Sequence, residues 1–154
     1  MRFLMVVLAL LCASPAVAST VSGRAEVIDG DSLRIGGQTV RLHGVDAFER
    51  GQMCAGVPCG REATARMRAM VRDALVVCAR TDTDRYGRMV ARCRVGETDL
   101  GAALVRAGWA FAYTRYSAAY LPDQRAAERA RAGVWATGQA VTAPWTWRAA
   151  RAAS

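Results

Sequence analysis

The chain has 154 residues, a length typical of one domain, and 53% of them are hydrophobic, which is enough to bury a core. It has 21 basic residues, all arginine, against 13 acidic ones, and the formal net charge of +8 favours a polyanionic partner such as nucleic acid or an anionic membrane surface. One histidine and no lysine exclude two-histidine cleavage of RNA and metal sites built from several imidazoles, and neither a P-loop nor a nucleophile-elbow serine is present. Solubility or genome base composition would explain the charge equally well, so the charge alone assigns no function.

The N-terminus has the features of a signal peptide at residues 1–18. Arg2 supplies a positive charge, residues 3–12 are apolar, and Ala16-Val17-Ala18 is a cleavage signal that places the mature start at Ser19. The apolar run is too short to span a bilayer, and bulky Leu11 before Cys12 argues against a lipoprotein. We therefore expect export to the periplasm or the extracellular space, with no membrane attachment after the signal is removed.

Four cysteines remain in the mature chain, namely Cys54, Cys59, Cys78 and Cys93, and they allow three pairings. A zinc cluster is disfavoured because there is no C-x-x-C motif and only one histidine. We favour bridges Cys54–Cys59 and Cys78–Cys93, since the second pair is equidistant from the middle of a predicted hairpin.

The first strands form a predicted β-meander with turns at Asp29-Gly30 and Gly36-Gly37. A loop from Gly44 to Gly60 follows. Val134-Trp135 and the pair Trp145 and Trp147 are expected to dock the tail on the barrel. The periodicity and turn residues predict strands at 23–28, 32–35, 38–42, 75–80 and 89–95, and helices at 61–71, 99–107 and 122–132. Five short strands and three helices, with the strands first, predict an α+β protein around a small, partly open barrel.

Three polar segments carry the residues suited to chemistry, although each alone is weak. Asp31 follows a tight turn, Asp46 and Glu49 share one loop, and residues 82–88 read as a polar hairpin loop. Taken singly, the segment of Asp31 is explained as a turn, that of Asp46 and Glu49 as a solvated strand end with its loop, and residues 82–88 as a connection between strands. Together, three carboxylates with carbonyls and water would supply the oxygen shell that calcium needs.

These segments resemble the staphylococcal nuclease-like (thermonuclease) family. The matching segments are I-D-G-D-S at 28–32, V-R-L-H-G-V-D-A-F-E at 40–49, D-R-Y-G-R at 84–88, D-L-G-A-A-L-V-R-A-G-W-A at 99–110 and A-R-A-G-V-W at 130–135. They occur in order, with compatible spacings, over nearly the whole mature chain. Five such segments in register are hard to obtain by chance.

The resemblance implies an OB-fold-like five-stranded β-barrel with three helices, in a domain at 19–154 with a core at about 22–136 and a tail at 137–154. It also implies calcium-dependent hydrolysis of phosphodiester bonds in DNA and RNA, leaving 3′-phosphate ends. We expect single strands to be favoured and the protein to be a monomer. By motif, the implied calcium ligands are Asp31, Asp46 and the carbonyl of Ala47, and the implied catalytic residues are Arg41, Glu49 and Arg88.

The chain departs from the family pattern at Phe48, where the family usually has proline. Proline would stiffen the loop between Asp46 and Glu49, and a Cys54–Cys59 ring is a candidate replacement for that stiffness. The loop before the first helix is also shorter than in the staphylococcal enzyme. Tyr113, Tyr116 and Tyr120 are candidates for base stacking, with plain packing as the alternative, and Tyr86 is a candidate for packing near the substrate.

Two other functions compete with a nuclease. A non-catalytic OB-type nucleic-acid-binding module would also bind polyanions in a salt-dependent way. Retention of the five implied site side chains argues against it. An exported structural or interaction domain gives no reason for those polar residues to occur together.

Overall fold

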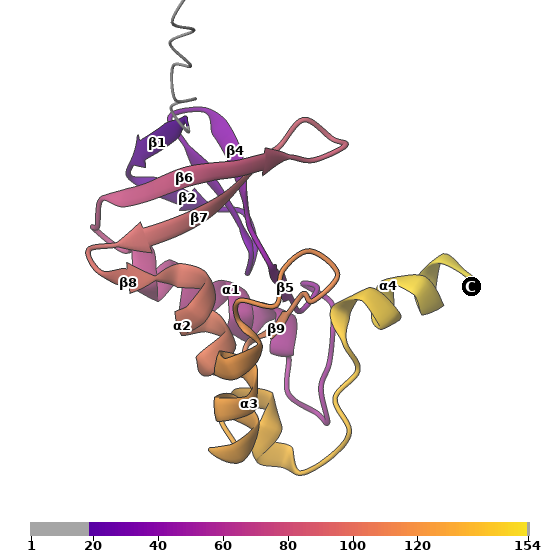
Figure 1. Ribbon diagram of the computed structural model, residues 1–154. Helices are drawn as coiled ribbons and strands as arrows, with labels where there is room; N and C mark the ends of the chain where they lie inside the picture. Colours follow the sequence, from indigo (N-terminus) through magenta and orange to yellow (C-terminus); the bar gives the residue numbers. More distant parts are fainter. Residues whose placement is uncertain (1–18, 154) are drawn as a thin grey trace, which may run out of the picture.

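A curled mixed sheet and a small two-stranded ribbon form the β-structure of the protein, which was obtained as a computed structural model describing residues 19–153 (Figure 1). The predicted signal peptide lies outside the described residues. In the larger sheet the order is β1 (Thr20–Gly23), β6 (Val76–Thr83), β7 (Met89–Val95), β4 (Gln38–Leu42), β3 (Ser32–Ile35) and β2 (Ala25–Val27), with β8 (Thr98–Asp99) paired to β7.

The predicted β-meander is confirmed, because β2 pairs antiparallel with β3 and β3 with β4. The first predicted strand, at 23–28, corresponds to β2, which pairs with β3. The strand β1 lies before it, was not predicted and pairs with β6. The next strand pair, β4 with β7, is parallel and sets Val40 opposite Met89. Arg41 follows Val40 and Arg88 precedes Met89, so this pairing brings two distant arginines to neighbouring strands.

Sequence analysis missed the second sheet, in which β5 (Val45–Ala47) pairs antiparallel with β9 (Ala110–Ala112). The first of these strands falls inside the predicted loop from Gly44 to Gly60. Each strand has three residues, too few to show an alternating pattern. The pairing sets Asp46 opposite Phe111 and thereby fixes the direction of a polar residue in a buried strand.

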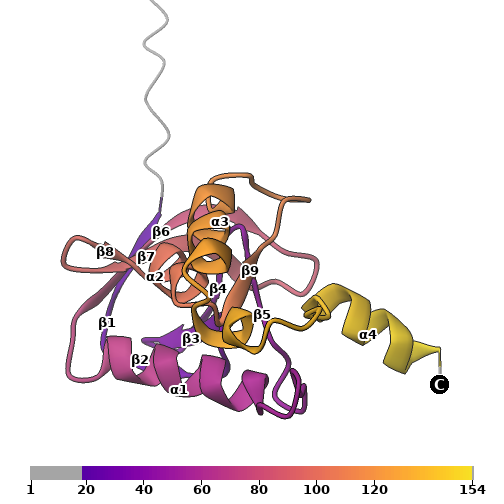
Figure 2. The same cartoon turned by 90° about the horizontal axis from the view of Figure 1, so that it is seen from below.

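Residues 19–153 contain four α-helices, one more than predicted: α1 (Cys59–Val71), α2 (Leu100–Arg106), α3 (Leu121–Arg129) and α4 (Pro144–Ala152), with a 3-10 turn η1 (Gly133–Thr137). The Asp99 carboxylate caps α2 as predicted, accepting from the backbone N–H of Ala102. Figure 2 shows α1 along the lower edge of the view, α2 and α3 in the middle, and α4 projecting to the right. The protein is thus α+β, with a curled mixed sheet forming a half-barrel.

An aromatic cluster attaches the C-terminal part of the chain to the body. Phe111 of β9 makes edge-to-face contacts with Phe48, Trp135 and Trp145, with ring centroids 5.3–5.7 Å apart. Trp145 belongs to α4, so the tail docks through this tryptophan as predicted, but it does so on the β5–β9 ribbon and not on the barrel. Trp147 instead lies beneath the guanidinium of Arg151, at 4.8 Å.

Both favoured disulfides are present. Cys78 and Cys93 lie opposite each other in the β6–β7 hairpin, with Cα atoms 4.0 Å apart, and Cys54–Cys59 closes a short ring before α1, with Cα atoms 5.7 Å apart. Two disulfides indicate an oxidising compartment. Within residues 19–153, no helix has both the length and the apolar character needed to cross a membrane.

Loop length predicts unequal contributions from the two disulfides. The cysteines are 15 residues apart in Cys78–Cys93 and 5 apart in Cys54–Cys59. Unfolded-state entropy gives about 3 and about 2 kcal/mol respectively. We expect urea denaturation to show a larger loss of unfolding free energy in C78S/C93S than in C54S/C59S. The reverse order would mean that the small ring mainly stabilises the native loop that carries Glu49.

Candidate active site

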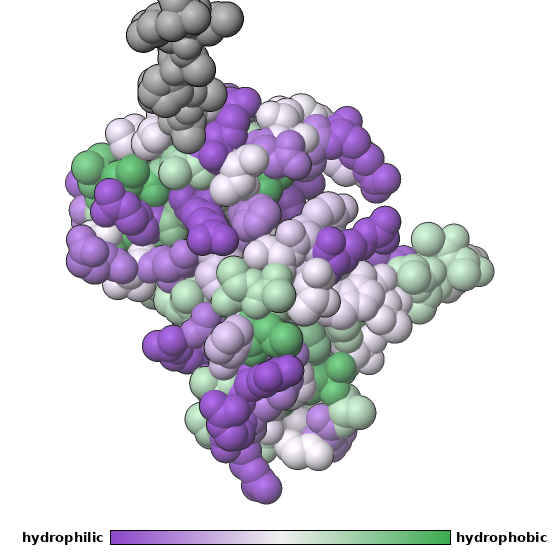
Figure 3. Space-filling model, viewed as in Figure 1, coloured by the Kyte–Doolittle hydropathy of each residue, from purple (hydrophilic) through white to green (hydrophobic). Residues whose placement is uncertain are grey.

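A polar pocket of about 870 Å³ opens where the half-barrel meets the β5–β9 ribbon. The surface around the loop joining β6 and β7, at the upper right of Figure 3, is mainly hydrophilic, and the end of α4 is weakly hydrophobic. Four of the five predicted site side chains line this pocket: Asp31, Arg41, Glu49 and Arg88. The fifth, Asp46, lies directly behind the guanidinium of Arg41.

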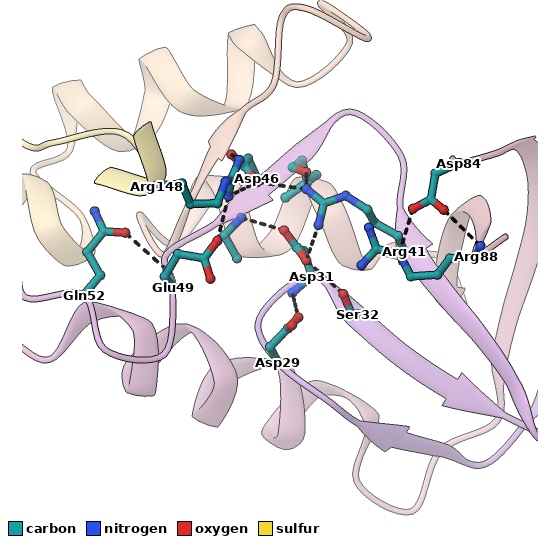
Figure 4. Close-up of polar contacts among 12 residues, drawn as sticks. Asp29, Asp31, Ser32, Arg41, Asp46, Glu49, Gln52, Asp84, Arg88 and Arg148 are labelled. Atoms are coloured by element: carbon teal, nitrogen blue, oxygen red, sulfur yellow. Dashed lines mark hydrogen bonds and ion pairs between the residues drawn. The ribbon is translucent and has the colours of Figure 1, made fainter. Parts of the chain in front are cut away.

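Arg41 joins the two aspartates (Figure 4). Its Nη1 donates to Oδ1 of Asp31 and its Nη2 to Oδ1 of Asp46, both at 2.8 Å. The side chains of Asp31 and Asp46 are 6% and 0% exposed, and that of Arg41 is 20% exposed. One guanidinium therefore neutralises part of the charge of two buried carboxylates held side by side.

Asp31 is fixed by its neighbours as well as by Arg41. Its Oδ2 accepts from the backbone N–H of Ala47 at 2.9 Å, and its Oδ1 accepts from the Ser32 hydroxyl at 3.1 Å. Gly30 makes this approach possible, because a Cβ there would lie 2.7 Å from the Cβ of Ala47. A residue with a side chain at position 30 would push the two segments apart.

Burial raises the pKa of both aspartates. The pKa of Asp31 rises to about 6 because desolvation outweighs the attraction of Arg41. Desolvation likewise raises the pKa of Asp46 against the hydrogen bond from Arg148. At both carboxylates, burial therefore has a larger effect on the pKa than the attraction of the neighbouring arginines.

Glu49 occupies a tight turn that several contacts hold. Gln52 accepts from the Glu49 N–H through its side-chain oxygen at 3.2 Å and donates its own N–H to the Glu49 carbonyl at 2.7 Å. Gly60, at the start of α1, approaches so closely that a Cβ would lie 1.7 Å from that carbonyl. Phe48 is buried against Phe111, so aromatic packing fixes the residue that replaces proline.

Arg88 lies on the opposite side of the pocket from Glu49 and contacts neither aspartate of the buried pair. Its Nε donates to Asp84 Oδ2 at 2.7 Å, and Asp84 also accepts from the backbone N–H groups of Tyr86 and Arg88. Although desolvation opposes it, this set of hydrogen bonds lowers the pKa of Asp84. The hairpin turn thus holds Arg88 by its Nε and leaves the rest of the guanidinium for other contacts.

Arg148 is a site residue that sequence analysis missed. It reaches the pocket from α4, where its Nη2 donates to Asp46 Oδ2 at 2.8 Å and its Nη1 to Glu49 Oε1 at 2.7 Å. Desolvation lowers the pKa of Arg148, but the hydrogen bonds to these carboxylates raise it by more. The pKa is raised overall, so the residue stays charged. Nothing in the sequence distinguishes this arginine from Arg151, the other arginine of the predicted tail.

The tyrosines divide into different environments. Tyr120 is buried and donates its hydroxyl to Asp99, which makes it a packing residue. Tyr113 stacks on Trp145 with ring centroids 5.2 Å apart. Tyr86 and Tyr116 are exposed at the pocket. Base stacking stays a hypothesis for Tyr116, and packing near the substrate stays one for Tyr86.

The donor chemistry of the pocket fits a hard divalent cation. Asp31 and Asp46 offer adjacent carboxylate oxygens, the ligand type that calcium prefers, and the main chain of Ala47 lies beside them. Within the part of the chain that the structure describes, no three His, Cys, Asp or Glu side chains gather closely enough to hold a metal. A bound cation would accordingly take its remaining ligands from carbonyls and water.

Comparison with known proteins settles the relationship of the chain. The family model described as staphylococcal nuclease homologue matches residues 39–137. The chain belongs to this family. Within this staphylococcal nuclease domain lie Arg41, Asp46, Glu49 and Arg88, whereas α4 and its Arg148 lie beyond the match.

Relatives of this staphylococcal nuclease homologue have diverse names. An uncharacterized endonuclease of Escherichia coli O157:H7 is 30% identical over 87% of this chain and 89% of its own length. Protein ParB of Escherichia coli is 31% identical over 90% and 85%. The succinoglycan biosynthesis protein ExoI of Rhizobium meliloti is 34% identical over 77% of this chain, which spans 66% of that protein.

Removing Arg41 from this staphylococcal nuclease homologue should destabilise it strongly. In R41Q two buried carboxylates lose a shared partner, so we expect the free energy of unfolding to fall by about 3 kcal/mol. R34Q is the matched control, since Arg34 sits on the adjacent strand in an exposed pair with Glu26 and should cost less than about 1 kcal/mol. Equal losses in denaturant titrations would show that Asp31 and Asp46 need no counter-charge from Arg41.

Proposed function

We propose that the protein is a calcium-dependent nuclease that hydrolyses phosphodiester bonds of DNA and RNA. The observation that carries the proposal is the pocket of a staphylococcal nuclease family member lined by Asp31, Arg41, Glu49 and Arg88. Single strands are the favoured substrate, and the OB-like barrel of the family is the framework that we assign to the half-barrel. Export through the N-terminal signal and action as a monomer belong to the same proposal.

Arg41 and Arg88 are the proposed electrostatic stabilisers. Attack of water on a phosphodiester adds charge at phosphorus, and planar guanidiniums bind nonbridging oxygens through paired N–H groups. Arg41 is on β4 and Arg88 immediately precedes β7, the parallel neighbour of β4, so both line one pocket. A guanidinium holds its protons too tightly to act as a general acid, so both arginines are assigned charge stabilisation and not proton donation.

Glu49 is the proposed base that orients and deprotonates the attacking water. The proton of the attacking water passes to Glu49 and from there to solvent, and the new bond joins the water oxygen to phosphorus. The bond from phosphorus to the 5′-oxygen breaks, and this oxygen takes a proton from solvent water, which leaves a 3′-phosphate and a 5′-hydroxyl. Gln52 and Gly60 hold the backbone turn at Glu49, and this turn fixes the position from which the Glu49 side chain extends. Asp31 and Asp46, with the Ala47 carbonyl, would hold calcium, which when bound neutralises phosphate charge and orients the group.

The first test is cleavage of single-stranded DNA and RNA by purified residues 19–154, with calcium or with EGTA, followed by end-group analysis. We expect calcium-dependent cleavage with 3′-phosphate ends. In E49Q the rate should fall about 10²–10⁴-fold, because a positioned base is lost. Binding measured at low salt should persist.

A non-catalytic binding module predicts a different result. It would bind single strands with the same salt dependence but would release no cleaved product, whether calcium or EGTA is present. Cleavage that survives EGTA, or that leaves 5′-phosphate ends, would contradict the assigned chemistry even if the protein is a nuclease.

The two arginines of the β6–β7 loop offer a matched comparison for the role of Arg88. Arg85 and Arg88 both lie over the Tyr86 ring, at 4.9 and 5.5 Å, and either change to glutamine removes one charge. We expect R88Q to lower kcat by about 10²–10³-fold through loss of a transition-state donor. R85Q should keep kcat close to that of the unaltered protein. If R85Q and R88Q lowered kcat equally, Arg88 would act only through its positive charge and not as a specific transition-state donor.

A further inference from the structure

We propose that Arg148 is a built-in competitor of the divalent cation, so that cation binding at Asp46 exchanges a guanidinium for a metal ion. The inference rests on the proposed function, because it assumes that Asp46 is a cation ligand. It concerns α4, which lies beyond the family match. The exchange would set how much calcium the protein needs.

Arg148 binds the Asp46 carboxylate from the side opposite to Arg41 (Figure 4). Its Nη2 donates to Oδ2 at 2.8 Å and its Nη1 to Oδ1 at 3.2 Å, a fork on both oxygens of one carboxylate. Arg41 donates to the same Oδ1 at 2.8 Å. Both oxygens of Asp46 are consequently engaged by guanidinium nitrogens.

The arginines also separate Asp46 from solvent. The Asp46 side chain is 0% exposed, and Arg41 and Arg148, in contrast to Asp46, line the pocket. Calcium binds carboxylate oxygens at about 2.3–2.6 Å, a distance that leaves no room for an intervening guanidinium. One of the two arginines must therefore withdraw before a cation reaches Asp46.

Of the two arginines, Arg148 lies closer to solvent, and it is the one that we assign to withdraw. Arg41 is 20% exposed and is held by Asp31 as well as by Asp46, whereas Arg148 is 39% exposed. A guanidinium closer to water regains its hydration more readily when its ion pair breaks. Its other partner, Glu49, is itself half-exposed at the pocket.

The attachment of α4 keeps Arg148 close to the site after it withdraws. Trp145, almost one helical turn earlier, stacks on Tyr113 and contacts Phe111, and the Gln52 side chain donates to the Thr142 carbonyl at 2.8 Å. In the proposed exchange the side chain of Arg148 moves and α4 stays docked. A tethered charge has a high effective concentration, so Arg148 would return to Asp46 whenever the cation leaves.

Calorimetric titration of calcium chloride into the nucleic-acid-free protein tests the competition without measuring cleavage. We expect R148Q to bind calcium about tenfold more tightly than the unaltered chain, the scale of coupling between charges in one network. R151Q is the matched control, because Arg151 is on the same helix and lies over the Trp147 ring at 4.8 Å. R148K keeps the charge without the fork, and its affinity should be intermediate.

An unchanged or weaker calcium affinity in folded R148Q would overturn the competition, and so would an equal gain in R151Q. Circular dichroism and thermal unfolding of each variant, with and without calcium, establish that the fold is kept. Should R148Q fail to fold, an R148K affinity no tighter than that of the unaltered chain would overturn the inference. If the unaltered chain binds calcium and cleaves DNA, such results would leave the proposed function intact. Failure of every variant to bind calcium would reject both.

Discussion

The buried pair Asp31 and Asp46 is the constraint on which the pocket depends. Two carboxylates that are buried away from solvent repel each other, and they need a positively charged group at contact distance. Arg41 supplies it by donating to both at 2.8 Å, and in doing so it links the start of β3, the strand β4 and the strand β5. The half-barrel and the β5–β9 ribbon are thereby joined by charge as well as by packing.

Local features of the fold were predictable from the sequence because the interacting residues are close along the chain. The β-meander follows from the Asp29-Gly30 and Gly36-Gly37 turns, and the Cys78–Cys93 bridge follows from hairpin symmetry. Arg41, Asp31 and Glu49 could be chosen as site residues because they belong to segments with a family resemblance. Their grouping around one pocket agrees with that choice, while their roles stay proposals.

Long-range features escaped sequence analysis for physical reasons. The strand around Asp46 needs a partner at Phe111, and three residues carry no period of their own. Arg148 depends on the docking of α4 through Trp145, which places one of many arginines against two carboxylates. Phe48 could not be interpreted from the sequence for the same reason. It replaces the stiffness expected from proline by packing on Phe111, a ring that is distant in the chain.

The parallel pairing of β4 with β7 bears on how the chain folds. Val40 and Met89 are neighbours in the sheet although about 50 residues separate them in the chain. Closing so long a loop costs entropy before any contact repays it, which makes such pairings slow relative to hairpins and helices. The meander and the β6–β7 hairpin can therefore form early as independent units. Arg41 and Arg88 meet at one pocket only when those two units dock, which makes docking the step that creates the pocket.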